Sequence, residues 1–138
     1  NLRISLQYYA HTFGVRAVLW HQGEADNLLN TSAGRYASLL RAVIDKSRQD
    51  IGRNVSWVVA QASYDDNLGS DGGVIAGQQQ AIASAGNTYN GPFTDNIQIP
   101  RGAQSENVHF GAQSMATLAN VWSSSLNDGF FASSQPIT

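Results

Sequence analysis

Cysteine is absent from the 138 residues of the chain, and its absence excludes three kinds of chemistry. Without cysteine the protein has no disulfide, no thiolate ligand for a metal ion and no cysteine nucleophile. The same absence assigns no compartment.

Charged residues are scarce as well, at 13% of the chain, and the eight lysines and arginines are scattered singly. Nucleic-acid binding depends on clustered basic side chains, so a chain with net charge -2 and no such cluster predicts no nucleic-acid partner. No apolar run reaches the length of a membrane span, so we expect no membrane partner either. The hydrophobic share of 42% predicts instead one folded domain with a core.

Apolar residues recur at helical spacing in four segments of the chain. Ser32 is expected to cap the second of these helices and Gly52 to end it. The predicted helices cover residues 2–13, 32–52, 74–85 and 111–126. The apolar face of the first helix is expected to consist of Leu2, Leu6, Tyr9 and Phe13.

Short apolar runs at residues 15–20 and 55–60 predict buried parallel strands, and residues 97–99 are predicted as a third short strand. Asn87–Pro92 is interpreted as a turn-rich connection. Helices that alternate with strands predict an α/β fold of three layers (α/β/α) around a parallel sheet. Because so few strands rarely form a stable parallel sheet, we expect the N-terminal portion of the sheet upstream of Asn1 or on another chain.

The chain is expected to hold one domain and a short tail. Residues 1–131 are predicted to form the C-terminal part of that domain. Residues 132–138 are small and polar and include Pro136, so they are predicted to form a linker-like tail.

A polar segment follows the first predicted strand, at the place where open α/β sheets bind ligands. Residues 21–27 (His-Gln-Gly-Glu-Ala-Asp-Asn) come directly after Trp20. Gln22 offers two amide N–H donors, and Gly23 allows a close approach of the backbone. An ordinary polar loop between a strand and a helix has the same composition, so the segment alone leaves both interpretations open.

A second polar segment, residues 105–110, precedes the last predicted helix. Glu106 and His109 stand three residues apart, close enough for the carboxylate to accept a hydrogen bond from one imidazole nitrogen. Such a contact would orient the imidazole and leave its other nitrogen as a general base. A structural histidine beside a helix-capping acid is the alternative that the same spacing allows.

Together the segments resemble a known family. Residues 18–26 (Val-Leu-Trp-His-Gln-Gly-Glu-Ala-Asp) resemble the Trp-x-Gln-Gly-Glu-(Ser/Ala)-(Asp/Asn) block of SGNH hydrolases related to sialate O-acetylesterases and carbohydrate acetylesterases. Gly91–Asp95 is similar to the family's Gly-Pro-x-Thr-Asp segment, and Gln78 matches a recurrent glutamine. Asn107–Phe110 matches the Asp-x-Val-His-Phe block, and the blocks occur in the family's order and spacing.

The resemblance implies an SGNH-type α/β fold and a Ser-His-acid esterase site. Gln22 would donate its side-chain amide to the oxyanion, with Gly23 beside it. His109 would be the general base and then the general acid. Glu106, where the family usually has Asp, would orient the imidazole.

Neighbouring residues would support these groups. Glu24 and Asp26 are expected to brace the loop by hydrogen bonding, and His21 to line the site. The resemblance implies no metal and no cofactor, and an acetylated carbohydrate as the substrate. By analogy with polysaccharide deacetylation, the setting would be secreted or periplasmic.

The family's nucleophile is a serine in a Gly-x-Ser-x block, and the sequence has no such block. Ser5 lies on a predicted helix, Ser63 follows a strand and Ser105 sits near His109, so none has the expected context. We therefore expect the nucleophile on residues upstream of Asn1 or on a separate polypeptide.

Three other functions remain open. A non-catalytic carbohydrate-binding module would stack Trp20, Trp57 and Tyr64 on sugar rings. An SGNH lipase or thioesterase would use the same catalytic groups on another ester. A nucleotide-binding domain would use the glycine-rich residues 69–73, although they lack the lysine of a phosphate-binding loop.

Overall fold

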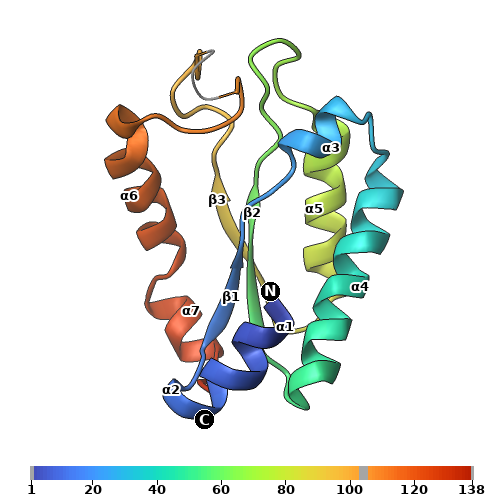
Figure 1. Cartoon of the computed structure of the whole chain (residues 1–138), viewed down its shortest axis with the longest axis vertical. Coiled ribbons are helices and arrows are strands. Elements are labelled where there is room, and N and C mark those ends of the chain that lie inside the picture. The colour runs from blue at the N-terminus through green and yellow to red at the C-terminus, as the bar shows by residue number, and fades with distance from the viewer. Residues whose placement is uncertain (1, 103–105, 138) are drawn as a thin grey trace.

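The computed structural model describes residues 2–102 and 106–137, and it is built around a parallel three-stranded sheet (Figure 1). The strands are β1 (Ala17–Trp20), β2 (Ser56–Gln61) and β3 (Thr88–Phe93), in the order β1-β2-β3. Ala17 pairs with Ser56 and Val59 pairs with Asn90. Helices cover both faces of the sheet, which confirms the predicted α/β class.

One face of the sheet carries the main core. Helices α4 (Ala33–Ile51) and α5 (Gly72–Ser84) pack there and bury Ile44 against Trp57. The predicted ends of α4 are confirmed: the Ser32 side chain accepts from the Arg35 amide, and Gly52 adopts a left-handed φ of 67°. Because Ile44 is fully buried, its truncation to alanine should cost about 2–5 kcal/mol of folding free energy.

The opposite face is covered more loosely. A 3-10 turn (Ala112–Ser114) leads into α6 (Met115–Ser125), and α7 (Asp128–Ser133) follows. Unlike α4, α6 buries none of its residues fully. The last predicted helix is therefore confirmed but begins with a 3-10 turn.

The C-terminal segment after α7 docks on the sheet instead of extending away from it. Ile137 and Val15 exchange main-chain hydrogen bonds of 2.7 and 2.8 Å, and Ser134 is buried. Arg16 Nη1 donates to the Ser134 carbonyl at 2.7 Å. The division into a domain of residues 1–131 and a tail of residues 132–138 stays a prediction.

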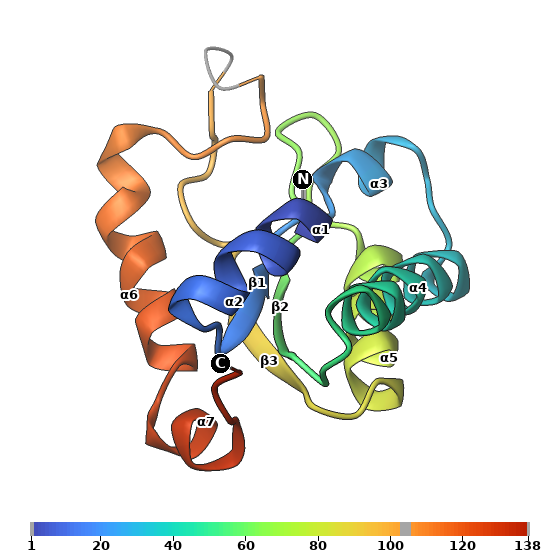
Figure 2. The same cartoon turned by 60° about the horizontal axis from the view of Figure 1, so that its bottom comes forward.

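The predicted N-terminal helix is one continuous helical segment with a π-helical middle (Figure 2). It consists of α1 (Leu2–Ile4), the π turn η1 (Ser5–Tyr9) and α2 (Ala10–Phe13), and it packs beside α4 and β1. The predicted apolar face was half wrong, because Leu6 and Ala10 are buried whereas Tyr9 and Phe13 are exposed. A π turn holds an extra residue per turn, so it rotates the following residues off the face that α-helical spacing predicts.

Two predicted segments between α5 and α6 are wrong. Residues 88–93, interpreted as part of a turn, form β3, and residues 97–99 form no strand. Gly91 allows these residues to pair with β2, because the two backbones lie very close together there. A Cβ at position 91 would lie only 2.7 Å from the Ala60 nitrogen of β2. Gln98 has a left-handed φ of 52°, which ends any extended run at 97–99.

The polar segment after β1 also contains a short helix that the periodicity did not predict, α3 (Glu24–Leu28). No helix in the described part of the chain is both long and apolar enough to cross a membrane.

Candidate active site

The carboxyl ends of the three parallel strands meet at one edge of the sheet, and the loops that follow them gather there (Figure 1). A pocket of about 440 Å³ lies among these loops. Residues from the segment after β1 and from the segment before α6 line it together: His21, Gln22, Glu24, Ala25, Val108, His109 and Phe110. The structure therefore places Gln22 and His109, distant in sequence, at one cavity.

The side-chain amide of Gln22 has a hydrogen-bonding group of the protein beside each of its ends. Its Nε2 donates to Asp26 Oδ2 at 2.7 Å, and the Tyr36 hydroxyl lies 3.1 Å from its Oε1. The same hydroxyl donates to the Gln22 main-chain oxygen at 2.8 Å. Because an amide nitrogen carries two N–H donors and Asp26 takes one, the oriented amide has a second donor to offer.

Buried Gln78 locks the segment after β1 to the end of β2. Its Nε2 donates to the carbonyls of Gln22 and Ala62 at 3.0 and 2.8 Å, and its Oε1 accepts from the Ala62 amide at 3.1 Å. Gly23 lies in the same crowded place, where a Cβ would sit 1.8 Å from the Ala62 oxygen. Only glycine fits at position 23, because any side chain would clash with the backbone of Ala62.

His21 is half-buried where it lines the pocket. Its Nε2 lies 3.2 Å from Thr94 Oγ1, and its ring centroid lies 5.7 Å from that of Phe110. Burial lowers the pKa of His21, while the charge of Glu24 raises it. Burial is the largest of these effects, so the pKa of His21 lies below its ordinary value and the neutral ring is favoured.

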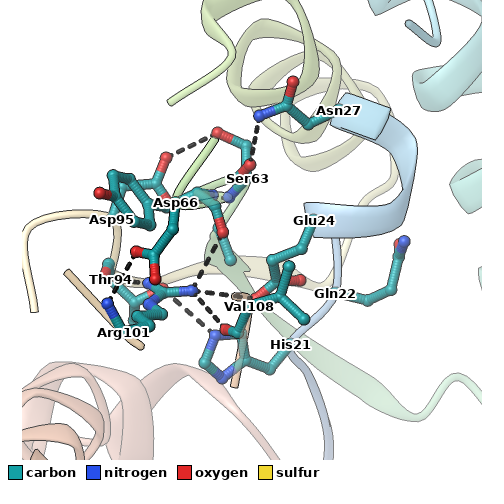
Figure 3. A network of polar contacts seen from close by, with 12 residues as sticks. His21, Gln22, Glu24, Asn27, Ser63, Asp66, Thr94, Asp95, Arg101 and Val108 are labelled. Carbon is teal, nitrogen blue, oxygen red and sulfur yellow. Dashed lines mark hydrogen bonds and ion pairs between the residues drawn. The ribbon is translucent and has the colours of Figure 1, made fainter. Parts of the chain in front are cut away.

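Glu24 faces the guanidinium of Arg101, which the sequence did not single out. The charged groups lie 3.7 Å apart, and the Arg101 side chain is 0% exposed. The guanidinium donates to the carbonyls of Tyr64, Thr94 and Val108 (Figure 3). Arg101 was missed because these partners are main-chain oxygens of separate loops, which leave no spacing motif in the sequence.

His109 lines the open side of the pocket, and Glu106 lies beside it. His109 Nε2 lies 3.7 Å from Glu106 Oε2, which is too long for a hydrogen bond and close enough for an ion pair whenever the imidazole carries a proton. The two side chains are 72% and 85% exposed. Glu106 and Asn107 both have left-handed φ values, 55° and 64°, which turn the chain sharply before His109.

A comparison with family models now adds to this geometry. The model described as "Carbohydrate esterase, sialic acid-specific acetylesterase" matches residues 3–127. The chain belongs to this carbohydrate esterase family. The match spans both motif blocks and confirms the predicted membership of the SGNH-type acetylesterases. Comparisons with curated proteins and with solved structures found no match.

The predicted Ser-His-acid site requires a serine nucleophile, and no serine among the described residues lines the pocket. Ser63 is fully buried, where its Oγ donates to Asp95 Oδ2 at 2.6 Å and accepts from the Asp71 amide at 2.8 Å. Ser5 lies on the N-terminal helical segment, away from this pocket. Ser105 lies outside the described residues.

Within residues 2–102 and 106–137, no group of three or more His, Cys, Asp or Glu side chains is placed to hold a metal ion. The acidic side chains near the pocket are engaged with other protein groups: Asp26 accepts from Gln22, Glu24 faces Arg101 and Asp95 accepts from Ser63.

Proposed function

We propose that the protein is a carbohydrate O-acetylesterase in which this chain supplies the oxyanion donor Gln22 and the base His109. The observation that carries the proposal is the pocket that both residues line. Family membership supports the reaction class, since the family consists of carbohydrate esterases. The nucleophilic serine is proposed to come from outside the described residues.

The proposed reaction begins when the serine Oγ attacks the carbonyl carbon of a sugar acetate and His109 takes the serine proton. The carbonyl oxygen gains negative charge, which the Gln22 amide and the backbone at Gly23 stabilise. The intermediate expels the sugar oxygen, which receives the proton from His109. Water, activated by His109, then releases acetate from the serine.

The remaining groups hold these two in place. Asp26 orients the Gln22 amide through the 2.7 Å hydrogen bond, and Glu106 supplies a counter-charge to the imidazolium of His109. His21 presents a neutral ring to the pocket, which adds no charge beside the leaving sugar.

The substrate is proposed to be an O-acetylated sugar, in a secreted or periplasmic setting. The loops at residues 64–73 and 94–96 that follow β2 and β3 are rich in Asp, Asn, Gly and Ser, which suits a polyhydroxylated ligand better than an acyl chain. Rates on esters of increasing acyl length separate the alternatives: an acetylesterase prefers acetate, whereas a lipase or thioesterase prefers longer chains.

Two of the other functions lose their physical basis. The stacking surface of a carbohydrate-binding module was expected to include Trp57 and Tyr64, and both side chains are buried. The glycine-rich residues 69–73 do not cradle a phosphate, because the Asp71 carboxylate accepts from the Gly73 and Val74 amides at the start of α5. A carboxylate in that place repels an anion.

The proposal is tested with an aryl acetate and two proteins: the 138-residue chain alone, and the chain joined to its upstream coding sequence. We expect turnover and a covalent acetyl adduct on a serine only in the longer protein. Burst kinetics with an adduct on Ser5 or Ser63 of the chain alone would show that the nucleophile has been misplaced.

A further inference from the structure

Arg101 carries a buried charge beside the pocket, and its contacts reach several separate loops. Nη1 donates to the Val108 carbonyl at 2.7 Å and to the Tyr64 carbonyl at 3.2 Å, and Nη2 donates to the Thr94 carbonyl at 3.1 Å. Figure 3 shows the guanidinium at the centre of these contacts. The segments after β2 and β3 and the segment before α6 therefore share one cation.

Aromatic rings pack against the face of the guanidinium, in addition to the carbonyls that its edge contacts. The Phe110 ring lies 4.1 Å from the guanidinium carbon, and the Tyr64 ring lies 5.0 Å away. Aromatic faces attract a desolvated guanidinium, and its planar shape suits this stacking better than an ammonium group does. Val108 and Phe110, the two neighbours of His109 in sequence, are thus both attached to Arg101.

Glu24 connects this cation to the other half of the pocket. It follows Gln22 by two positions, is 17% exposed and lies 3.7 Å from the guanidinium. A buried guanidinium needs a counter-charge and hydrogen-bond acceptors to offset its lost hydration. The counter-charge, Glu24, therefore comes from the segment that contains Gln22. One of the acceptors, the Val108 carbonyl, comes from the segment that contains His109.

The main chain at position 101 is held independently of its side chain. The Arg101 and Gly102 amides donate to Asp66 Oδ1 and Oδ2 at 2.7 and 2.6 Å, and the Arg101 amide is the main cause that lowers the Asp66 pKa. Because these bonds use the backbone, a change of the Arg101 side chain leaves them in place.

We propose that Arg101 is a positioning residue that holds the segment of His109 against the segment of Gln22, with Glu24 as its counter-charge. The catalytic part of this inference rests on the proposed esterase function, whereas the physical tether does not. Lysine at position 101 keeps the charge but lacks the planar fork, so it cannot serve the three carbonyls and the Phe110 face together.

The experiment compares wild type with Arg101→Lys, Glu24→Gln and the double variant, each in the protein that includes the upstream coding sequence. Hydrogen exchange reports on residues 106–111, and kcat and KM are measured with an aryl acetate. For Arg101→Lys we expect exchange in 106–111 to rise about tenfold and kcat to fall about 100-fold, because a displacement of about 1 Å is enough for such a loss. KM should stay within about threefold of wild type, since the reacting groups are displaced and not the binding surface.

Glu24→Gln should change exchange in residues 106–111 and kcat in the same directions, by about a tenth as much. The double variant should have a kcat no lower than that of Arg101→Lys, because both changes disrupt one interaction. If Arg101→Lys does not fold, the Glu24→Gln variant tests the proposal, since it keeps the guanidinium and the shape of the Glu24 side chain. Faster exchange with unchanged kcat would overturn the positioning role, and unchanged exchange in both single variants would overturn the tether.

Arg16 provides the matched control. It also donates to carbonyls, those of Ser134 and Phe131, and stacks 5.2 Å from the Phe131 ring, but it lies at the amino end of β1. Arg16→Lys should alter exchange near residues 131–137 and leave residues 106–111 and kcat unchanged. If the longer wild-type protein shows no esterase activity, the proposed function fails, while the exchange data still decide whether the tether exists.

Discussion

The two walls of the pocket differ in how firmly the protein holds them. On the Gln22 wall, the amide is bonded to Asp26 and Tyr36, and Gln78 ties the backbone to β2. On the other wall, the His109 side chain is 72% exposed and touches Glu106 only at 3.7 Å. On the first wall the reacting side chain itself is held, whereas on the second Arg101 contacts the neighbours of His109 and the His109 side chain stays exposed.

This difference matches what each wall is proposed to do. An oxyanion donor helps most when it is oriented before the charge develops, because no reorganisation is then needed during the reaction. The exposed His109 side chain, in contrast, is open to the serine and the leaving group between which it transfers a proton. The comparison predicts that changes on the Gln22 wall affect both stability and turnover, whereas changes on the His109 wall affect turnover alone.

The largest effect is expected for His109→Ala in the protein with its upstream segment. Loss of the base should lower turnover of an aryl acetate by about 1000-fold or more. The melting temperature should not move, because the side chain is mostly exposed. A drop in stability comparable to that of a core variant would show that the His109 wall is structurally essential, which would break the comparison.

Gln22→Ala should come next, with turnover reduced about 100- to 1000-fold. It should also cost about 1–3 kcal/mol of folding free energy, because Asp26 and the Tyr36 hydroxyl lose a partner. Urea unfolding and steady-state kinetics measure the two effects together. Gln79→Ala, an exposed glutamine on α5, is the control and should change neither. Near-normal turnover of Gln22→Ala would remove the oxyanion assignment.

Glu106→Gln should have a smaller effect, with turnover reduced about tenfold, because an exposed ion pair in water contributes little. The change keeps the shape of the side chain and removes only its charge. The wild-type rate should fall towards that of the variant as salt is added. A loss as large as that of His109→Ala would mean that the two groups form a tighter contact during the reaction.

The smallest effect concerns the stability of the Gln22 wall at different pH values. Burial lowers the pKa of His21 below 6.5, although Glu24 opposes it, so the unfolded chain binds a proton at a pH where the folded chain does not. The stabilisation by neutral His21 is therefore fully present above about pH 6.5 and is lost as the pH falls below it. Its slope cannot exceed about 1.4 kcal/mol per pH unit. Urea unfolding of His21→Gln between about pH 5 and 7 should show a flatter dependence than wild type.

Helix α4 shows which parts of the fold the sequence predicts well. Its apolar stripe, the Ser32 cap and the Gly52 end are all local signals, and the structure has each of them. Strand β3 shows the opposite case. Asn90, Gly91 and Pro92 have low strand propensity, and they are extended here because β2 offers a ladder on which glycine alone permits so close an approach.

The candidate site divides in the same way. Gln22 and His109 could be named from contiguous motifs, and they do line one pocket. Arg101 could not, because its hydrogen-bond acceptors are main-chain carbonyls, which every residue has, and its counter-charge Glu24 is distant in sequence. The pairing of Glu106 with His109 was predicted as a hydrogen bond from their spacing. The longer separation of 3.7 Å was not predicted, since it depends on two residues in left-handed conformations.

The backbone bridge between Val15 and Ile137 has a practical consequence. It anchors the C-terminal segment at the amino end of β1, whereas the pocket opens beyond that strand's carboxyl end. An affinity tag or a solid support attached after residue 137 would therefore lie at the end of the molecule opposite the pocket. Bulky polymeric substrates could then reach immobilised protein from the unobstructed side.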